Sequence, residues 1–94
     1  MEEYFGRIAR SKAGRDKGKR FAVIGKADEA HVLIADGDAR KIAKPKRKKL
    51  MHLAFENAKV ADIGAILAQP GGTADAALRR ALRDSSWRMP WSLA

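Results

Sequence analysis

The chain has 94 residues and no cysteine, which excludes disulfide bonds and thiolate metal sites. It also has no apolar run near the ~20 residues needed to span a bilayer. The first ten residues, MEEYFGRIAR, lack the apolar segment of a signal peptide. We therefore expect a cytoplasmic protein that does not engage a membrane.

Acidic residues are also scarce. Eleven Asp and Glu stand against 20 Lys and Arg, which gives a formal net charge of +9. Up to Leu53 there are 15 basic and 7 acidic residues, and from Ala54 onward only 5 and 4. Such an excess favours a polyanionic partner, although a basic surface can also simply keep a small protein soluble. Any polyanion site is expected in the first half of the chain.

Short apolar segments separated by turn signals dominate residues 1–53. Asp36-Gly37-Asp38 is typical of a hairpin turn, because Gly after Asp tolerates positive φ. This spacing predicts a mainly β fold, a small SH3-like barrel of about five strands. Phe5, Phe21 and Phe55 are expected in its core, since few other large apolar residues are available. The predicted strands are residues 4–10 (YFGRIAR), 21–25 (FAVIG), 31–35 (HVLIA), 39–43 (ARKIA) and 49–55 (KLMHLAF).

Residues 54–94 have a different character and predict a helical extension. Apolar residues at helical spacing within residues 57–69 indicate a first helix, and Pro70-Gly71-Gly72 indicates a break. Thr73 is expected to cap a second helix. Its predicted apolar stripe comprises Ala74, Ala77, Leu78, Ala81 and Leu82. The tail that follows, with Trp87 and Trp91, predicts no regular structure and no assignable role.

The decapeptide SKAGRDKGKR, residues 11–20, combines two glycines with five basic residues. It is not a nucleotide-binding P-loop, because its glycines are one residue too close and Arg20 replaces the required Ser or Thr. Glycines that let the backbone approach phosphate, together with cations, favour nucleic acid. An ordinary solvated hairpin loop remains the alternative.

The blocks SKAGRDKG (residues 11–18), VLIADG (32–37), Arg40-Lys41 and PKRKKLMHL (45–53) occur in an order that resembles the KOW motif. The resemblance is closest to bacterial KOW-domain RNA-binding proteins, which are similar to large-subunit ribosomal proteins of archaea and eukaryotes. It covers residues 6–53 and implies an SH3-like barrel that binds ribosomal RNA. Ala9 departs from the pattern, which has a bulky β-branched residue there, so the first strand is expected to pack loosely.

Residues 44–49, KPKRKK, are expected to form a second basic loop that contacts phosphate. The alternative function is a protein–protein adaptor, with the second helix docking into a partner such as a ribosomal protein, or an elongation-type KOW module. No nucleophile–base pair, cofactor motif or metal-ligand set is recognised, so we predict a protein without enzymatic activity. The candidate RNA-binding residues are Lys12, Gly14, Arg15, Lys17, Gly18, Lys19, Arg20, Arg40, Lys41, Lys44, Lys46, Arg47, Lys48 and Lys49.

Overall fold

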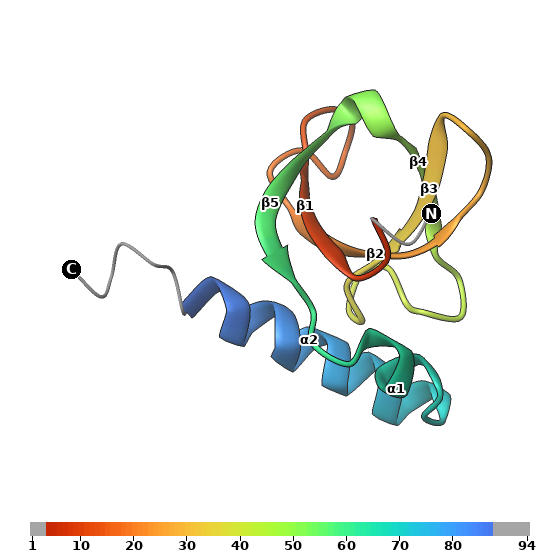
Figure 1. Ribbon diagram of the computed structural model, residues 1–94, viewed down its shortest axis with the longest axis vertical. Helices are drawn as coiled ribbons and strands as arrows, with labels where there is room; N and C mark the ends of the chain where they lie inside the picture. Colours follow the sequence, from red (N-terminus) through yellow and green to blue (C-terminus); the bar gives the residue numbers. More distant parts are fainter. Residues whose placement is uncertain (1–3, 88–94) are drawn as a thin grey trace.

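The computed structural model describes residues 4–87. Five antiparallel strands form one sheet in the order β4-β3-β2-β1-β5, which curves into a barrel-like ring, and two helices follow it (Figure 1). The mainly β class with C-terminal helices is confirmed. The elements are β1 (Arg7–Ser11), β2 (Arg20–Lys26), β3 (His31–Ala35), β4 (Lys46–Lys49), the 3-10 helix η1 (Leu50–His52), β5 (Leu53–Lys59), α1 (Ile63–Leu67) and α2 (Gly71–Trp87).

The inner face of the curved sheet encloses the first of two apolar cores. Ala9 lies directly opposite Phe21 on β2 and Phe55 on β5. Ala9 and Phe21 are both fully buried, so the two flanking rings occupy the room that the small Ala9 leaves. The expected core position of Phe21 is confirmed, whereas Phe55 and Phe5 are half-buried and pack against the inner and the outer core, respectively. This core comprises Ala9, Phe21, Val23, Val32, Ile34 and Leu53, with Tyr4, Leu50 and Phe55 packed against it.

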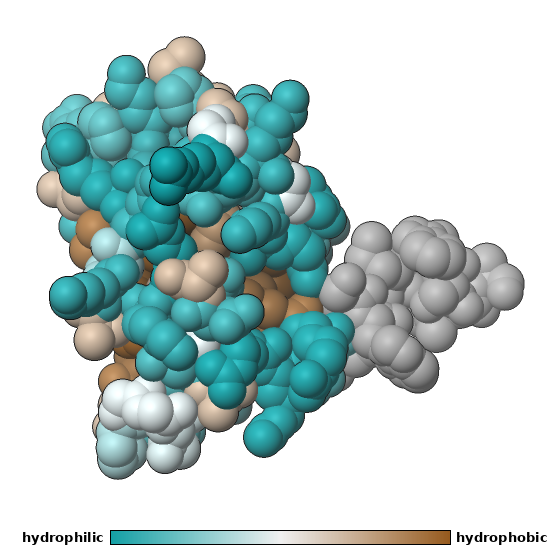
Figure 2. Space-filling view, turned by 180° about the vertical axis from the view of Figure 1, so that it is seen from behind, coloured by the Kyte–Doolittle hydropathy of each residue, from teal (hydrophilic) through white to brown (hydrophobic). Residues whose placement is uncertain are grey.

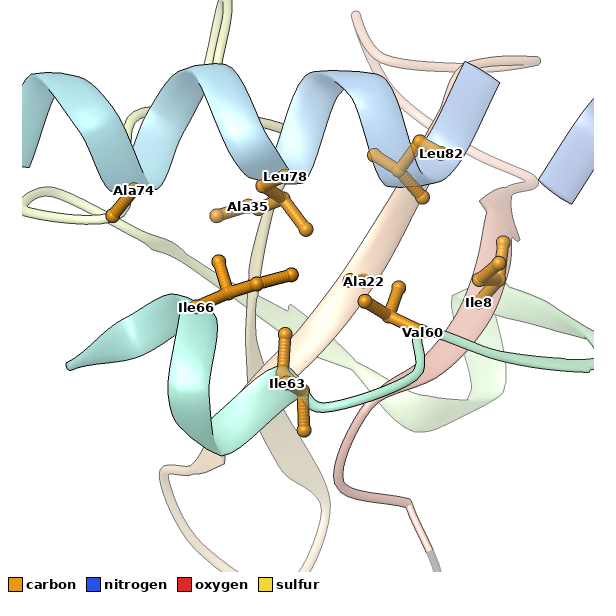
Figure 3. Close-up of a cluster of buried hydrophobic side chains, with 9 residues drawn as sticks. All are labelled: Ile8, Ala22, Ala35, Val60, Ile63, Ile66, Ala74, Leu78 and Leu82. Carbon is orange, nitrogen blue, oxygen red and sulfur yellow. The ribbon is translucent and has the colours of Figure 1, made fainter. Parts of the chain in front are cut away.

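The outer face of the same sheet is covered by the helices (Figure 3). Ala22 and Ala35 point outward from β2 and β3, and their small side chains let α2 approach the sheet closely. From α2, Ala74, Leu78 and Leu82 are buried here, which confirms the predicted apolar stripe. The helices are therefore the second layer of the fold. The outer core comprises Ile8, Ala22, Ala35, Val60, Ile63, Ile66, Ala74, Leu78 and Leu82.

The turn after β3 lies close against α2. Gly37 has φ +78°, and a Cβ there would lie 2.2 Å from the backbone oxygen of Asp75. The buried Asp75 carboxylate accepts a hydrogen bond from the Ile42 N–H at 2.8 Å. Arg79 donates to the Gly37 carbonyl. Glycine is thus needed both for the turn and for the close approach of the helix.

Several strand-level predictions are wrong. Residues 4–6 form a turn before β1, and Leu50–His52, predicted within a strand, form η1. Residues 39–43 form turns and no strand, because Asp36 holds the loop through bonds from the Asp38 and Arg40 N–H groups. Residues 46–49, predicted as a basic loop, instead form β4, paired with β3. β5 continues to Lys59, six residues beyond the expected end of the barrel at residue 53.

The helices also differ from expectation. α1 is only five residues long. The predicted break between the helices is present at residues 68–70, but Gly71 and Gly72 belong to α2. The carbonyl of Pro70 accepts the first helical bond, from Ala74, and Thr73 lies inside the helix without capping it. α2 continues through Trp87 into the segment predicted to be irregular, and Trp91 lies outside the described residues.

Polar side chains cover most of the face seen in Figure 2, and apolar atoms appear mainly in the gaps between them. Among residues with a described burial, Met51 on η1 is the only large hydrophobic residue that is exposed. No helix within residues 4–87 is long and apolar enough to cross a membrane.

Candidate nucleic-acid interface

Residues 12–19 connect β1 to β2 in a compact loop closed by its own backbone. The Ser11 N–H donates to the Lys19 carbonyl, and the Gly18 N–H donates to the Ser11 carbonyl at 2.8 Å. Gly14 and Gly18 have φ of +80° and +89°, in the left-handed region that favours glycine. The two glycines therefore set the shape of the loop.

Asp16, the one acidic residue of the loop, points inward and is buried. Its Oδ2 lies 3.3 Å from Lys46 Nζ and 3.6 Å from Arg40 Nη2. Burial by itself raises the pKa of Asp16, but the neighbouring Lys46, Arg40 and Lys48 outweigh it and lower that pKa below its ordinary value. Asp16 is thus ionised at neutral pH and ties the loop to β4 and to the segment before it.

Lys48 makes a second tie between the loop and β4. Its side chain is almost fully buried, and its Nζ donates to the Ala13 carbonyl at 2.8 Å. Lys46 and Lys48 lie opposite Ile34 and Val32, which belong to the inner core, so both lysines share the inward face of β4. The two basic segments predicted as separate loops are one connected assembly.

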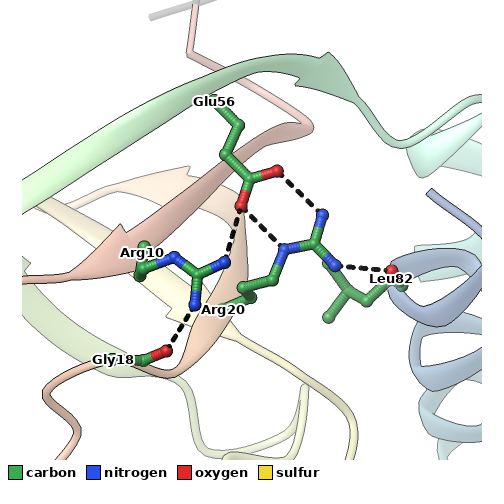
Figure 4. A network of polar contacts seen from close by, with 5 residues as sticks. All are labelled: Arg10, Gly18, Arg20, Glu56 and Leu82. Atoms are coloured by element: carbon green, nitrogen blue, oxygen red, sulfur yellow. Dashed lines mark hydrogen bonds and ion pairs between the residues drawn. The ribbon is translucent and has the colours of Figure 1, made fainter. Parts of the chain in front are cut away.

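The far end of the loop is held by the network in Figure 4. Arg20 donates to Glu56 through Nε at 2.7 Å and Nη2 at 2.9 Å, and through Nη1 to the Leu82 carbonyl at 2.8 Å. Arg10 donates to the Gly18 carbonyl and lies 3.7 Å from the Glu56 carboxylate. The hydrogen bonds from Arg20 lower the pKa of Glu56. Arg20 therefore joins β2, β5 and α2, and its guanidinium is engaged within the fold.

Arg47, on the outward face of β4, is exposed and forms an ion pair with Asp28 at 2.7 Å. Asp28 also accepts hydrogen bonds from the Ala30 N–H and, at 2.8 Å, pairs with His31 Nδ1. The bond from Arg47 is the largest cause that holds the pKa of Asp28 far below its ordinary value, followed by His31 and Ala30. His31 is thus a strand residue with a structural partner.

The candidate residues fall into two groups. Arg20, Arg40, Lys46, Arg47 and Lys48 each bond or ion-pair within the fold, and of these Arg20 and Lys48 are the most enclosed. The other basic candidate residues have exposed side chains. They are Lys12, Arg15, Lys17 and Lys19 on the loop, Lys41 and Lys44 before β4, and Lys49 on β4.

Two acidic residues that organise this surface, Asp16 and Glu56, were not among the candidates. The sequence does mark Asp16 as unusual, since it is the single carboxylate in a segment with five basic residues. Nothing in the sequence points to a role for Glu56, because its partner Arg20 lies 36 residues away. Within residues 4–87 no three His, Asp or Glu side chains gather closely enough to hold a metal ion.

No protein-family model matches this chain, and no curated protein is significantly similar to it.

Proposed function

We propose that this protein binds RNA through the loop of residues 12–19, as a small SH3-like barrel of the KOW type. The observation that carries the proposal is the division of charge in that loop. Its only carboxylate, Asp16, is turned inward and neutralised, while Lys12, Arg15, Lys17 and Lys19 remain exposed. The curved five-stranded sheet supports the barrel assignment.

Contacts within the fold hold the loop in a defined shape. Asp16 and Lys48 tie its middle and first half to β4, and Arg10 holds Gly18. A surface fixed in advance loses less conformational entropy on binding than a mobile one. Contacts to phosphate position a protein without reading sequence, so structured RNA, recognised by its shape, is the expected target. The resemblance favours ribosomal RNA of the large subunit and a ribosome-associated role.

The burial of α2 argues against the adaptor alternative. It needs an apolar face on the second helix, yet Ala74, Leu78 and Leu82 of α2 are buried against the sheet. The exposed face of α2 carries Arg79, Arg80 and Arg83. RNA binding is therefore the function that we favour.

A filter-binding assay with a structured ribosomal RNA fragment tests the proposal. Arg15→Ala with Lys17→Ala should weaken binding about tenfold, a loss of ~1.4 kcal/mol. It should also reduce the slope of log affinity against log salt by about 1.4–1.8, since each lost phosphate contact contributes about 0.7–0.9.

The matched control is Arg80→Ala with Arg83→Ala, which removes the same charge from exposed positions on α2. This pair should change binding by less than about twofold. Equal losses in the two double variants, or none in the loop variant, would contradict the loop as the RNA contact. Co-sedimentation with ribosomal subunits across a salt series tests the ribosomal role separately.

A further inference from the structure

A groove with a volume of about 330 Å³ lies at the other end of the barrel strands. It is lined by Arg7, Asn57, Ala58 and Lys59, and Arg7 pairs with Lys59 across β1 and β5. Arg7 begins β1, whereas the loop of residues 12–19 follows the end of β1. Leu53, at the start of β5, pairs with Ser11 beside the loop, and the groove lies four to six residues further along β5, roughly 13–20 Å away.

The guanidinium of Arg7 is fixed in this groove. Its Nη2 donates to the Glu56 carbonyl at 2.9 Å, and its Cζ lies 5.3 Å from the centre of the Phe55 ring. Its Nε is buried and has no hydrogen-bond partner within the part of the chain that the structure describes. A buried donor without an acceptor is unfavourable, and the contacts of the structure use only Nη2, so the guanidinium has hydrogen-bonding capacity that the fold does not use.

The lining of the groove is suited to an anion. It carries two cations and the Asn57 amide, and none of its four residues is acidic. Glu56 directly precedes Asn57 in the sequence, but alternation along β5 places its side chain on the face opposite to that of Asn57 and Lys59, where it pairs with Arg20. The ring of Tyr4 stacks on Phe55 at 5.1 Å, which adds aromatic surface beside Arg7.

We propose that this groove binds a phosphate group, independently of the loop of residues 12–19. Arg7 and Lys59 supply charge and Asn57 supplies a neutral donor. An arginine of fixed orientation suits the planar, multidentate recognition of phosphate oxygens. The phosphate belongs either to an RNA backbone or to a free nucleotide.

Amide chemical shifts of ¹⁵N-labelled protein test the site residue by residue. Inorganic phosphate, titrated against chloride at equal ionic strength, should produce saturable shifts at residues 7 and 57–59. Asn57→Ala with Lys59→Ala, both at exposed positions, should weaken this binding at least fivefold. Lys26→Ala, at an exposed position on β2, is the control and should leave it unchanged.

Titrations with adenosine monophosphate and with hexauridylate then separate the two sources. Tighter binding of the oligonucleotide than of the mononucleotide identifies an RNA backbone, and the reverse identifies a free nucleotide; either result supports the groove. Shifts that do not saturate, or that saturate at the same phosphate concentration in the Asn57→Ala, Lys59→Ala protein, overturn it. Arg15→Ala with Lys17→Ala should leave the phosphate shifts intact, so failure of the loop proposal is distinguishable from failure of the groove.

Discussion

Replacing Asp16 with asparagine keeps the shape of the side chain and removes the one negative charge beneath the basic loop. Losing one partner of a fully buried ion pair costs about 3–5 kcal/mol, whereas fully exposed pairs contribute about 0–1 kcal/mol. The side chain of Asp16 is 6% exposed, but those of Lys46 and Arg40 are 29% and 35% exposed. We therefore expect Asp16→Asn to reduce the free energy of unfolding by about 2 kcal/mol at pH 7.

A loss of this size should lower the melting temperature by roughly 8–16 °C, since 1 kcal/mol corresponds to about 4–8 °C in a domain of 60–100 residues. Calorimetry between pH 7 and pH 3 checks both the size and the origin of the loss. The pKa of Asp16 is lower in the folded protein, so its contribution is complete above the unfolded pKa of about 3.9. It fades as the pH falls through the folded pKa.

The difference between the two proteins should accordingly stay constant from pH 7 to pH 5 and shrink below about pH 4. Asp28 and Glu56 also have lowered pKa values, but they are present in both proteins and cancel in the difference. Equal stability at pH 7, or a difference that does not depend on pH, would refute the role of Asp16 as a charged anchor.

The same variant separates the charge of the loop from its shape. Asp16→Asn raises the net charge by one, so affinity for RNA should rise if only the total charge matters. If the anchored shape is needed, affinity should fall, and we expect a loss of about threefold, or ~0.65 kcal/mol. Filter binding at fixed salt distinguishes these outcomes, and a gain in affinity would show that Asp16 limits binding.

Three further substitutions test the packing of the fold, each by urea denaturation against a matched control. Gly37→Ala should lower the free energy of unfolding by more than about 3 kcal/mol, because the new Cβ would clash with the Asp75 backbone. In the control Gly18→Ala the new Cβ would lie in open space and only the positive φ is strained, so the loss should be about 1–2 kcal/mol. Arg20→Lys keeps the charge but loses the guanidinium that bonds both Glu56 and the Leu82 carbonyl, so it should lower the free energy of unfolding by about 1–2 kcal/mol. The control Lys19→Ala, at an exposed position, should change it by no more than about 0.5 kcal/mol. Leu78→Ala should cost about 2–5 kcal/mol, and Thr73→Ala, at an exposed position inside α2, should cost nothing or stabilise slightly. A loss of stability in the Thr73→Ala variant would instead support the prediction that Thr73 caps the helix.

The sequence predicted those elements whose apolar pattern is local. FAVIG and HVLIA carry compact apolar runs, and both are strands within one or two residues of the predicted bounds. The stripe of α2 was equally clear, because Ala74, Leu78 and Leu82 recur every four residues. In each case the side chains that define the pattern are the ones buried in the structure.

The failures arise where tertiary contacts override the local signal. β4 consists of KRKK, which has no apolar alternation, and it is a strand because β3 pairs with it and Lys48 reaches Ala13. Gly71 and Gly72 are poor helix formers, yet packing of the residues that follow holds them in the first turn of α2. The Arg20–Glu56 pair joins residues 36 positions apart, which no short motif records.

The burial of the sheet on both faces has a consequence for how the chain is made. Ala22 and Ala35 become buried only when side chains as far along the chain as Leu82 pack on them. Arg20 likewise donates its hydrogen bond to the Leu82 carbonyl only once that residue is present. At about 5–20 residues per second, synthesis from Lys59 to Leu82 lasts roughly one to five seconds. During that interval the nascent sheet has one uncovered face, and the fold closes only when its last helix emerges.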